Sequence, residues 1–417
     1  MSLDFSFSAE QQAWRAQVRE FAVRELLPNS REWDQAGVLP REAIRRMGKA
    51  GVLGVVGSRE LGGQGRDYVS LGIAIEEIAA ADVSCALIAW QQATHSHFFP
   101  GWGEDTVRAV HAGECVLALA TSEENAGSDL SAIEATAVPD GDHYVLNGRK
   151  VHVSTMPGAD VLAVSARIPD GPTRANASAS ASTSASASAS ASTNASSGPG
   201  AKVFAGAAKG RMVMLRVPTN LAGVTCTVME QMGARAHALG AIDFCNVRVP
   251  IGATLGDPGQ GKAIMYARFN VSRCLSPLAA LGAARAVLDE TIRFARHRVA
   301  FGRPIAANQG VSFPLVEHAA KIEAGRLLAY RALVANDHGQ DATTEAAMAK
   351  WFGISSAIEA IQDCLQVYGA NGYLKDYAVE QRLRDVYSFL FTGGTLNIMK
   401  LILVRQLLGA EFAGLRV

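Results

Sequence analysis

The spacing of apolar residues changes twice along this chain of 417 residues. From Ser8 to about Gly113 apolar residues recur at helical spacing, as at Trp14 and Val18. Near Val116 the pattern changes to short apolar runs bounded by Gly, Asp and Pro, which is typical of strands. Long helical patterns return from about Lys262. The chain is therefore predicted to be an α+β protein, mainly α, with its regions in the order helical, β, helical.

This order predicts three domains. They are an N-terminal α-helical domain (1–115), a central β domain (116–261) and a C-terminal α-helical bundle (262–417). The β domain is expected to be a small antiparallel barrel or sandwich, with strands at Val116–Leu119, Tyr144–Leu146, Val161–Val164, Met212–Val217 and Ile242–Val247.

One segment of the β domain, Gly171–Ala201, consists mostly of alternating Ala and Ser with some Thr and Asn. Such residues have little apolar area to bury, so folding cannot repay the entropy lost on ordering them. The segment is predicted to be a disordered insertion in a loop between two strands.

Charge and composition exclude several classes of partner. The 39 basic and 39 acidic side chains leave no net charge to attract nucleic acid or an anionic membrane. No stretch reaches about 18 consecutive apolar residues, and the N-terminus carries Asp4 and Glu10 instead of a signal-peptide core. The six cysteines form no C-x-x-C pair, which argues against a zinc site and a disulfide framework. We expect a cytoplasmic protein with no bound metal.

Three segments near the C-terminus carry a recognisable pattern. They are the turn Gln366–Tyr373, the pair Arg384-Asp385 and the stretch Phe391–Asn397. Together they resemble the flavin-binding signature of the acyl-CoA dehydrogenase family, Q-x-x-G-G-x-G-Y, then R-D, then Y-E-G-T. In this chain the last motif reads Thr-Gly-Gly-Thr, so Gly393 occupies the place of the family's catalytic glutamate.

Further segments resemble the same family in the expected order, so the resemblance covers nearly the whole chain apart from the Ala/Ser segment. Ser122–Asp129 is similar to T-E-P-x-A-G-S-D, Gly148–Thr155 to G-x-K-x-W-I-T-N, and Arg298–Gly302 with Gln309 to R-x-x-F-G and its following glutamine. The resemblance implies an N-terminal helical domain, a central β-barrel or sandwich, a C-terminal four-helix bundle, and bound FAD.

The residues that the resemblance assigns to FAD are of two kinds. Small and hydroxyl residues would face the flavin ring. In an ungapped match Ser122 takes the place of the motif's threonine, and a match with a one-residue insertion would give that place to Thr121. Arg298 would suit a pyrophosphate and Phe301 an adenine. In the family this second group reaches the flavin of a neighbouring subunit, which implies a homodimer or homotetramer. The full set is Ser122, Ser128, His152, Ser154, Arg298, Phe301, Gln309, Gln366, Gly369, Ala370, Thr395 and Asn397.

Both positions at which family members carry a catalytic base lack a carboxylate. The second position, immediately before Arg273, is Ser272. Neither glycine nor an unassisted serine can accept a proton at neutral pH. The candidate replacements are His95, His97 and His152. Because His95 and His97 are two residues apart on a predicted helix, they point to different faces, and at most one is expected to enter the acyl pocket.

For function, the resemblance implies oxidation of an acyl thioester on CoA or an acyl-carrier protein, with electron-transfer flavoprotein as acceptor. The substrate would contact Ser128, Asn270, Arg273 and Gly394. The missing carboxylate leaves three hypotheses open. The chain oxidises an unusual thioester with a base from a histidine or from the substrate. It is a flavin-dependent monooxygenase of the same fold, with oxygen as acceptor. Or it is a catalytically silent FAD-binding subunit of a heteromeric dehydrogenase.

Overall fold

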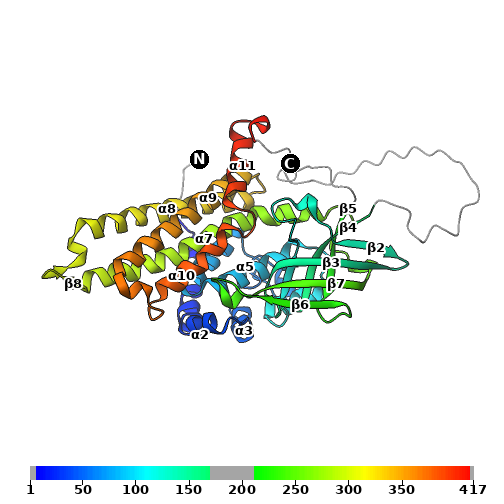
Figure 1. The fold of residues 1–417 in the computed structure, drawn as a ribbon, viewed down its shortest axis with the longest axis horizontal. Coiled ribbons are helices and arrows are strands. Elements are labelled where there is room, and N and C mark those ends of the chain that lie inside the picture. Colours follow the sequence, from blue (N-terminus) through cyan, green and yellow to red (C-terminus); the bar gives the residue numbers. More distant parts are fainter. Residues whose placement is uncertain (1–5, 170–210, 414–417) are drawn as a thin grey trace, which may run out of the picture.

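The computed structural model describes residues 6–169 and 211–413. The predicted insertion Gly171–Ala201 lies outside these residues. The predicted order of helical, β and helical regions is confirmed, as is the mainly α character (Figure 1). The domain boundaries near residues 115 and 261 stay a prediction. The first region contains helices α1 (Ala9–Phe21), α2 (Ser30–Ala36), α3 (Arg41–Lys49), α4 (Tyr68–Ala81), α5 (Val83–Phe98) and α6 (Glu104–Ala112).

Two aspartates set the course of α4 and α5, the buried helices of this region. Asp67 begins α4, and its carboxylate accepts a hydrogen bond of 2.7 Å from the backbone N of Ser70. Asp82 both ends α4 and begins α5, where it accepts from the backbone N of Cys85 at 2.6 Å. Such side-chain caps satisfy the free N–H groups at a helix start. They fix the direction of α5, the helix that carries His95 and His97.

The β region forms one seven-stranded sheet, in the order β1-β4-β2-β3-β7-β6 with β5 paired to β4. Its strands are β1 (Leu117–Ala120), β2 (Thr136–Asp140), β3 (His143–Ser154), β4 (Val161–Ile168), β5 (Arg211–Pro218), β6 (Val224–Met229) and β7 (Leu239–Pro250). The predicted antiparallel pairing holds for β2–β3, β3–β7, β4–β5 and β6–β7, but β1 and β2 pair with β4 in parallel. The chain passes through β2 and β3 between β1 and β4, which is long enough for a parallel crossover.

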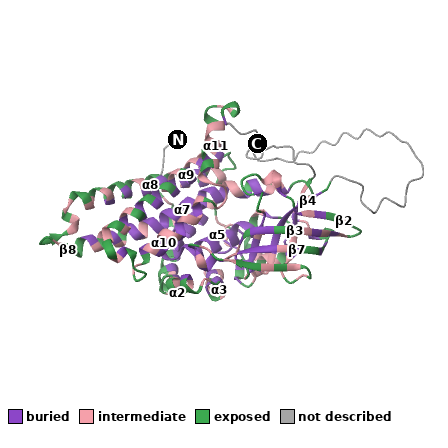
Figure 2. Ribbon diagram, in the orientation of Figure 1, coloured by how far each residue is buried: buried purple, intermediate pink, exposed green. Residues whose placement is uncertain are grey.

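The third region is a helical bundle built around one long buried helix. Its helices are α7 (Gly261–His297), α8 (Gln309–Asp337), α9 (Thr343–Tyr368), α10 (Ala378–Tyr387) and α11 (Leu396–Leu407). Among the described residues, α7 is the one helix long and apolar enough to cross a membrane, but 89% of that apolar window is buried within the fold. Helices α4, α8 and α9 pack against it. Figure 2 shows α7 largely buried, so its hydrophobicity is that of a core helix.

The two ends of the molecule differ in structure. A short hairpin of β8 (Val299–Ala300) and β9 (Arg303–Pro304) joins α7 to α8. Because α7, α8 and α9 alternate in direction, the end of α7, the start of α8 and the end of α9 lie together with this hairpin. Figure 1 shows the hairpin at one end of the molecule and the sheet at the other.

Candidate functional site

The loop Ser122–Asp129, which follows β1, is attached to β3 by a buried ion pair. Lys150 Nζ lies 2.6 Å from Glu123 Oε1, and the side chains are 0% and 9% exposed. Burial lowers the pKa of Lys150 to about 8, against the opposing effect of Glu123. The backbone N of Val151 also donates to Ser122 O at 2.9 Å. The loop is therefore held beside the strand that carries His152 and Ser154.

This loop and strand present unused polar groups to open space. Ser122, Ser128 and Ser154 are partly or fully exposed, and within the described parts of the chain their hydroxyls have no hydrogen-bond partner. A Cβ atom added at Gly127 would meet nothing within 4 Å. Thr121, the alternative to Ser122, is buried. Free donors beside open backbone fit a flavin ring, whose N1, N5 and O2 atoms accept hydrogen bonds.

His152 lies at an irregularity of β3. The pairing of β3 with β7 shifts register between Lys150 and Val153, and the φ angle of His152 is +56°. Positive φ is uncommon for a residue other than glycine. The side chain is exposed. The bulge thus turns His152 outward two residues before Ser154, at the sheet end where the Ser122–Asp129 loop lies, and such strain is typical of functional sites.

The second group of predicted FAD residues lies at the opposite end of the chain's fold. Arg298 and Phe301 belong to the β8–β9 hairpin, and Gln309 begins α8. All three are exposed, and Arg298 forms no ion pair with any described residue. The predicted turn residues Gln366, Gly369 and Ala370, at the end of α9, are exposed at this same end. A single protomer therefore does not bring the two groups together (Figure 1).

The turn at which the resemblance predicts the missing family base is bound by a buried lysine, Lys350. Gly393 and Gly394 have φ angles of +70° and +98°, in the region that favours glycine. Lys350 Nζ donates to the carbonyl oxygens of Thr392 and Gly394, on either side of Gly393. A Cβ atom added at Gly393 would lie 3.8 Å from this Nζ and would meet no other atom within 4 Å. There is thus room for a Cβ atom at Gly393, and a cation adjoins that position.

Thr395 and Asn397 follow this turn. The hydroxyl of Thr395 caps α11 by accepting from the backbone N of Ile398 at 3.3 Å. Asn397 is exposed in the first turn of α11. The capping role accounts for the residue type at Thr395, and its predicted contact with FAD stays a prediction.

The second family base position is occupied by a buried hydroxyl with a partner. Ser272 is 1% exposed, and its Oγ accepts a hydrogen bond of 3.1 Å from Trp90 Nε1. On the next face of α7, Arg273 donates to Asn270 Oδ1 at 3.3 Å, and Asn270 donates to Thr343 Oγ1 at 3.4 Å. Ser272 therefore bridges α7 to α5, whereas Asn270 and Arg273 face α9.

The structure places the two histidines of α5 on different sides. His97 is exposed, and its Nε2 lies 3.0 Å from the hydroxyl of Tyr68. His95 is 1% exposed, and neither of its ring nitrogens has a hydrogen-bond partner. Burial, aided by the charge of Arg268, lowers the pKa of His95 well below its usual value. His95 is therefore a neutral imidazole in the interior.

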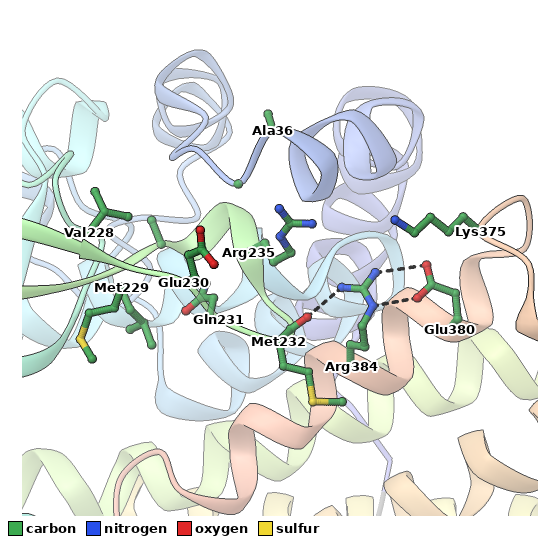
Figure 3. Close-up of a pocket in the computed structure, with 13 residues that line it drawn as sticks. Ala36, Val228, Met229, Glu230, Gln231, Met232, Arg235, Lys375, Glu380 and Arg384 are labelled. Carbon is green, nitrogen blue, oxygen red and sulfur yellow. Dashed lines mark hydrogen bonds and ion pairs between the residues drawn. The ribbon is translucent and has the colours of Figure 1, made fainter.

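The pocket drawn in Figure 3 has a volume of about 600 Å³ and contains Arg384 of the Arg384-Asp385 motif, but none of the residues predicted to contact FAD or substrate. It lies between α2, the hairpin of β6 and β7, and α10. Arg384 is neutralised there by Glu380 and by Asp34, and it also donates to Met232 O. The pocket adjoins strand β3, because its lining residue Leu239 pairs with Ser154 of that strand. Because Arg384 is already paired with two carboxylates, we assign the pocket no chemistry.

Two buried cations were missed by the sequence reasoning, Arg268 on α7 and Lys350 on α9. Neither belongs to a motif, and a charge in a helical pattern is usually exposed. Only the structure shows that they are buried: Arg268 is 5% exposed and Lys350 is 0% exposed. Residues 6–169 and 211–413 contain no group of three or more His, Cys, Asp or Glu side chains that could hold a metal ion.

Comparison with known proteins assigns the chain to a family. Three family models match in order along the chain: the acyl-CoA dehydrogenase N-terminal domain at residues 8–110, the middle domain at 118–187 and the C-terminal domain at 259–408. The probable acyl-CoA dehydrogenase YngJ of Bacillus subtilis is 30% identical, over 97% of this chain and 100% of its own length.

Two further relatives are similar over nearly their whole length. The caffeyl-CoA reductase-Etf complex subunit CarC of Acetobacterium woodii is 28% identical, over 96% of this chain and 99% of its own. The structure of a glutaryl-coenzyme A dehydrogenase in complex with glutaryl-CoA has a TM-score of 0.84 and 28% identity, and the match covers 98% of both chains. The fold and the open polar groups of the Ser122–Asp129 loop are consistent with these matches. The chain is an FAD-dependent oxidoreductase of the acyl-CoA dehydrogenase family.

Proposed function

We propose that this chain oxidises an acyl thioester across its α and β carbons without a carboxylate base at either family position. The relatives named above act on CoA thioesters according to their names. The observation that carries the proposal is the contrast between two parts of the site. The Lys150–Glu123 ion pair holds the Ser122–Asp129 loop, which is predicted to bind the flavin, against β3. Gly393 and Ser272, in contrast, supply no carboxylate. The carrier of the acyl group is CoA or an acyl-carrier protein.

Bound FAD would supply an acceptor for the hydride of the β carbon. Ser122, Ser128, His152 and Ser154 would bind and orient the ring. Arg298, Phe301 and Gln309, with Gln366, Gly369 and Ala370, would bind the remainder from a second protomer, since they lie at the far end of their own chain. This arrangement requires a homodimer or homotetramer.

Exposed apolar side chains support self-association. Val299, Phe301, Phe313, Val316, Tyr373 and Leu374 are all exposed at the hairpin end of the bundle. A group of large apolar side chains in one exposed region is typical of a protein–protein contact. A second copy that covers this end would also bring its own FAD to the Arg298 and Phe301 of the first copy, next to the pyrophosphate and adenine.

Of the three candidate histidines, His95 best fits the part of the base. It is buried and neutral, and its ring nitrogens have no hydrogen-bond partner, so the nitrogen that carries no hydrogen is available to accept a proton. His97 already contacts the Tyr68 hydroxyl at the exposed end of α5. His95→Gln should lower the rate of flavin reduction by about 10²-fold or more, and His97→Gln should change it little.

We further propose electron-transfer flavoprotein as the acceptor and the cytoplasm as the location. CarC is named as part of a complex with such a flavoprotein. The test of the function is a mass measurement of the thioester after incubation with the holoprotein and electron-transfer flavoprotein. Loss of two hydrogen atoms is expected. Gain of an oxygen atom would show a monooxygenase, and an unchanged thioester would favour the silent-subunit hypothesis.

A further inference from the structure

Five lysine and arginine residues are buried among the described residues, and they fall into two groups. Lys150 pairs with Glu123, and Arg382 pairs with Glu290 at 2.9 Å. The other three, Arg268, Arg273 and Lys350, form no ion pair with any residue in 6–169 or 211–413. All three lie in the first half of α7 or on α9 beside it. The unpaired buried cations are therefore gathered in one part of the molecule.

Arg273 and Lys350 are the two of these cations that are linked electrostatically. The positive charge of Arg273 contributes to lowering the pKa of Lys350, although burial contributes more, and together they bring it to about 7. Burial likewise lowers the pKa of Arg273 to about 10. Arg273 Nε is fully buried and has no hydrogen-bond partner. The charge of Arg273 is therefore felt at Lys350, and no Asp or Glu side chain is among the groups that shift either pKa.

The turn Thr392–Gly394 adjoins this pair. Lys350 Nζ uses two hydrogen bonds on the carbonyls of Thr392 and Gly394, which leaves the third N–H of an ammonium group without an acceptor. The open position beside Gly393 lies 3.8 Å from the same nitrogen. An anionic group entering beside Gly393 would therefore meet both the unused N–H and the charge of Arg273.

Burying a cation without a counter-ion is strongly unfavourable, and removing one partner of a buried pair leaves that penalty in place. In this chain the carboxylate that family members place at position 393 is missing, yet the cations around it remain. We infer that the acyl group of the substrate carries a carboxylate, which Arg273 and Lys350 bind beside the Gly393–Gly394 turn. This inference rests on the proposed thioester oxidation and specifies its substrate as the half-thioester of a short dicarboxylic acid.

Arg268 is assigned a different role. Its Nε donates to Thr94 Oγ1 at 3.2 Å, so it faces α5, on the opposite side of α7 from Lys350. It lies near His95, whose pKa its charge helps to lower. We assign Arg268 to keeping His95 neutral and not to binding the carboxylate.

The test compares thioesters of equal chain length on the FAD-loaded protein. Dissociation constants are measured by calorimetry and by the change in flavin absorbance for succinyl-CoA against butyryl-CoA and for glutaryl-CoA against pentanoyl-CoA. The same acyl groups are also loaded on an acyl-carrier protein. The carboxylate should tighten binding by about 10-fold or more on at least one carrier. Equal affinity for charged and neutral acyl groups would overturn the inference and leave the proposed function intact. If no thioester binds or bleaches the flavin, the proposed function fails instead.

Variants locate the site. Lys350→Met and Arg273→Gln should each reduce the ratio of charged to neutral affinity toward one. Arg248→Gln, which removes an exposed arginine paired with Asp140, should leave it unchanged. If Arg268→Gln removes the preference for charged over neutral acyl groups and Lys350→Met does not, the carboxylate does not bind on the α9 side of α7. FAD content and circular dichroism are measured for each variant, and the ratio in the wild-type protein decides the inference if a variant fails to fold.

Discussion

The Nζ atom of Lys350 lies 3.8 Å from the position that a Cβ atom of residue 393 would occupy, and Gly393 has no such atom. The lysine instead binds the carbonyls on both sides of that glycine. At the predicted place of the family's base there is therefore room for a Cβ atom, and a buried positive charge adjoins it.

Restoring the glutamate should restore ordinary acyl-CoA chemistry. Gly393→Glu would place a carboxylate next to Lys350, at a cost of about 1–2 kcal/mol for an L residue at φ +70°. The ion pair with Lys350 offsets part of this cost. We expect flavin reduction by butyryl-CoA to rise by about 10-fold or more. Binding of succinyl-CoA should weaken, because the new carboxylate occupies its place.

The matched control for this change is Gly394→Glu. It imposes a similar strain, at φ +98°, but its Cβ atom would lie against Met399 and not beside Lys350. Both variants are measured by anaerobic stopped-flow mixing after FAD content is checked. Equal effects of the two changes, or no gain in Gly393→Glu that retains FAD, would contradict this prediction.

Lys350 should make stability depend on pH in a definite direction. Its pKa is about 7 in the folded chain and 10.5 when unperturbed, so between these values the unfolded chain binds more protons. Its contribution to the free energy of unfolding is therefore most favourable above about pH 10.5 and falls as the pH drops to about 7. Methionine does not titrate, so Lys350→Met should gain stability relative to wild type as the pH falls from about 9 to about 7. Urea unfolding at several pH values measures this difference, and a difference independent of pH would refute it.

Arg298 should be required for FAD retention and not for folding. The side chain is exposed and forms no ion pair with a described residue of its own chain. Arg298→Ala should release FAD, measured as the ratio of flavin to protein absorbance, with little change in far-ultraviolet circular dichroism. Arg303→Ala is the control, because Arg303 lies in the same hairpin and donates to Asn308 Oδ1 at 2.6 Å. Equal FAD loss in both variants would point to a disturbed hairpin.

Residues 171–201 should be removable. Strands β4 and β5 are antiparallel neighbours, and Ile168 pairs with Arg211, so a short linker can join them after the deletion. The composition of the segment offers little area to bury, so the melting temperature and FAD content should stay nearly unchanged. A fall of the melting temperature by several degrees would show that the segment contributes to the packed fold.

The strands that the sequence predicted and those that it did not differ in burial. The predicted ones are buried apolar runs, such as β4. Strand β6 alternates half-buried and exposed residues at the edge of the sheet, and β2 contains Pro139, so neither shows a continuous apolar run. Pro139 is tolerated because β2 meets β4 at only one residue pair, Thr136 with Arg167. Pattern alone cannot reveal such strands.

The motifs located the candidate site, but its electrostatics could not be predicted. The resemblance identified Gly393, Ser272 and Arg273 by position. Lys350 has no motif and occurs 43 residues earlier in the chain, and only the packing of α9 beneath the turn brings it to Gly393. The burial of Arg268 and His95 depends in the same way on how α5 packs against α7. Such contacts between segments far apart in the sequence depend on how the helices pack, which sequence patterns do not reveal.

The central claim is that this chain takes a hydride from an acyl thioester although it lacks both family carboxylates. The most direct measurement is anaerobic mixing of the FAD-loaded protein with charged and neutral acyl thioesters on CoA and on an acyl-carrier protein, while the absorbance of oxidised flavin is followed. We expect at least one short dicarboxylic thioester to bleach the flavin, and to do so faster than the neutral thioester of the same length. Fully loaded protein that keeps its oxidised spectrum with every thioester would contradict it.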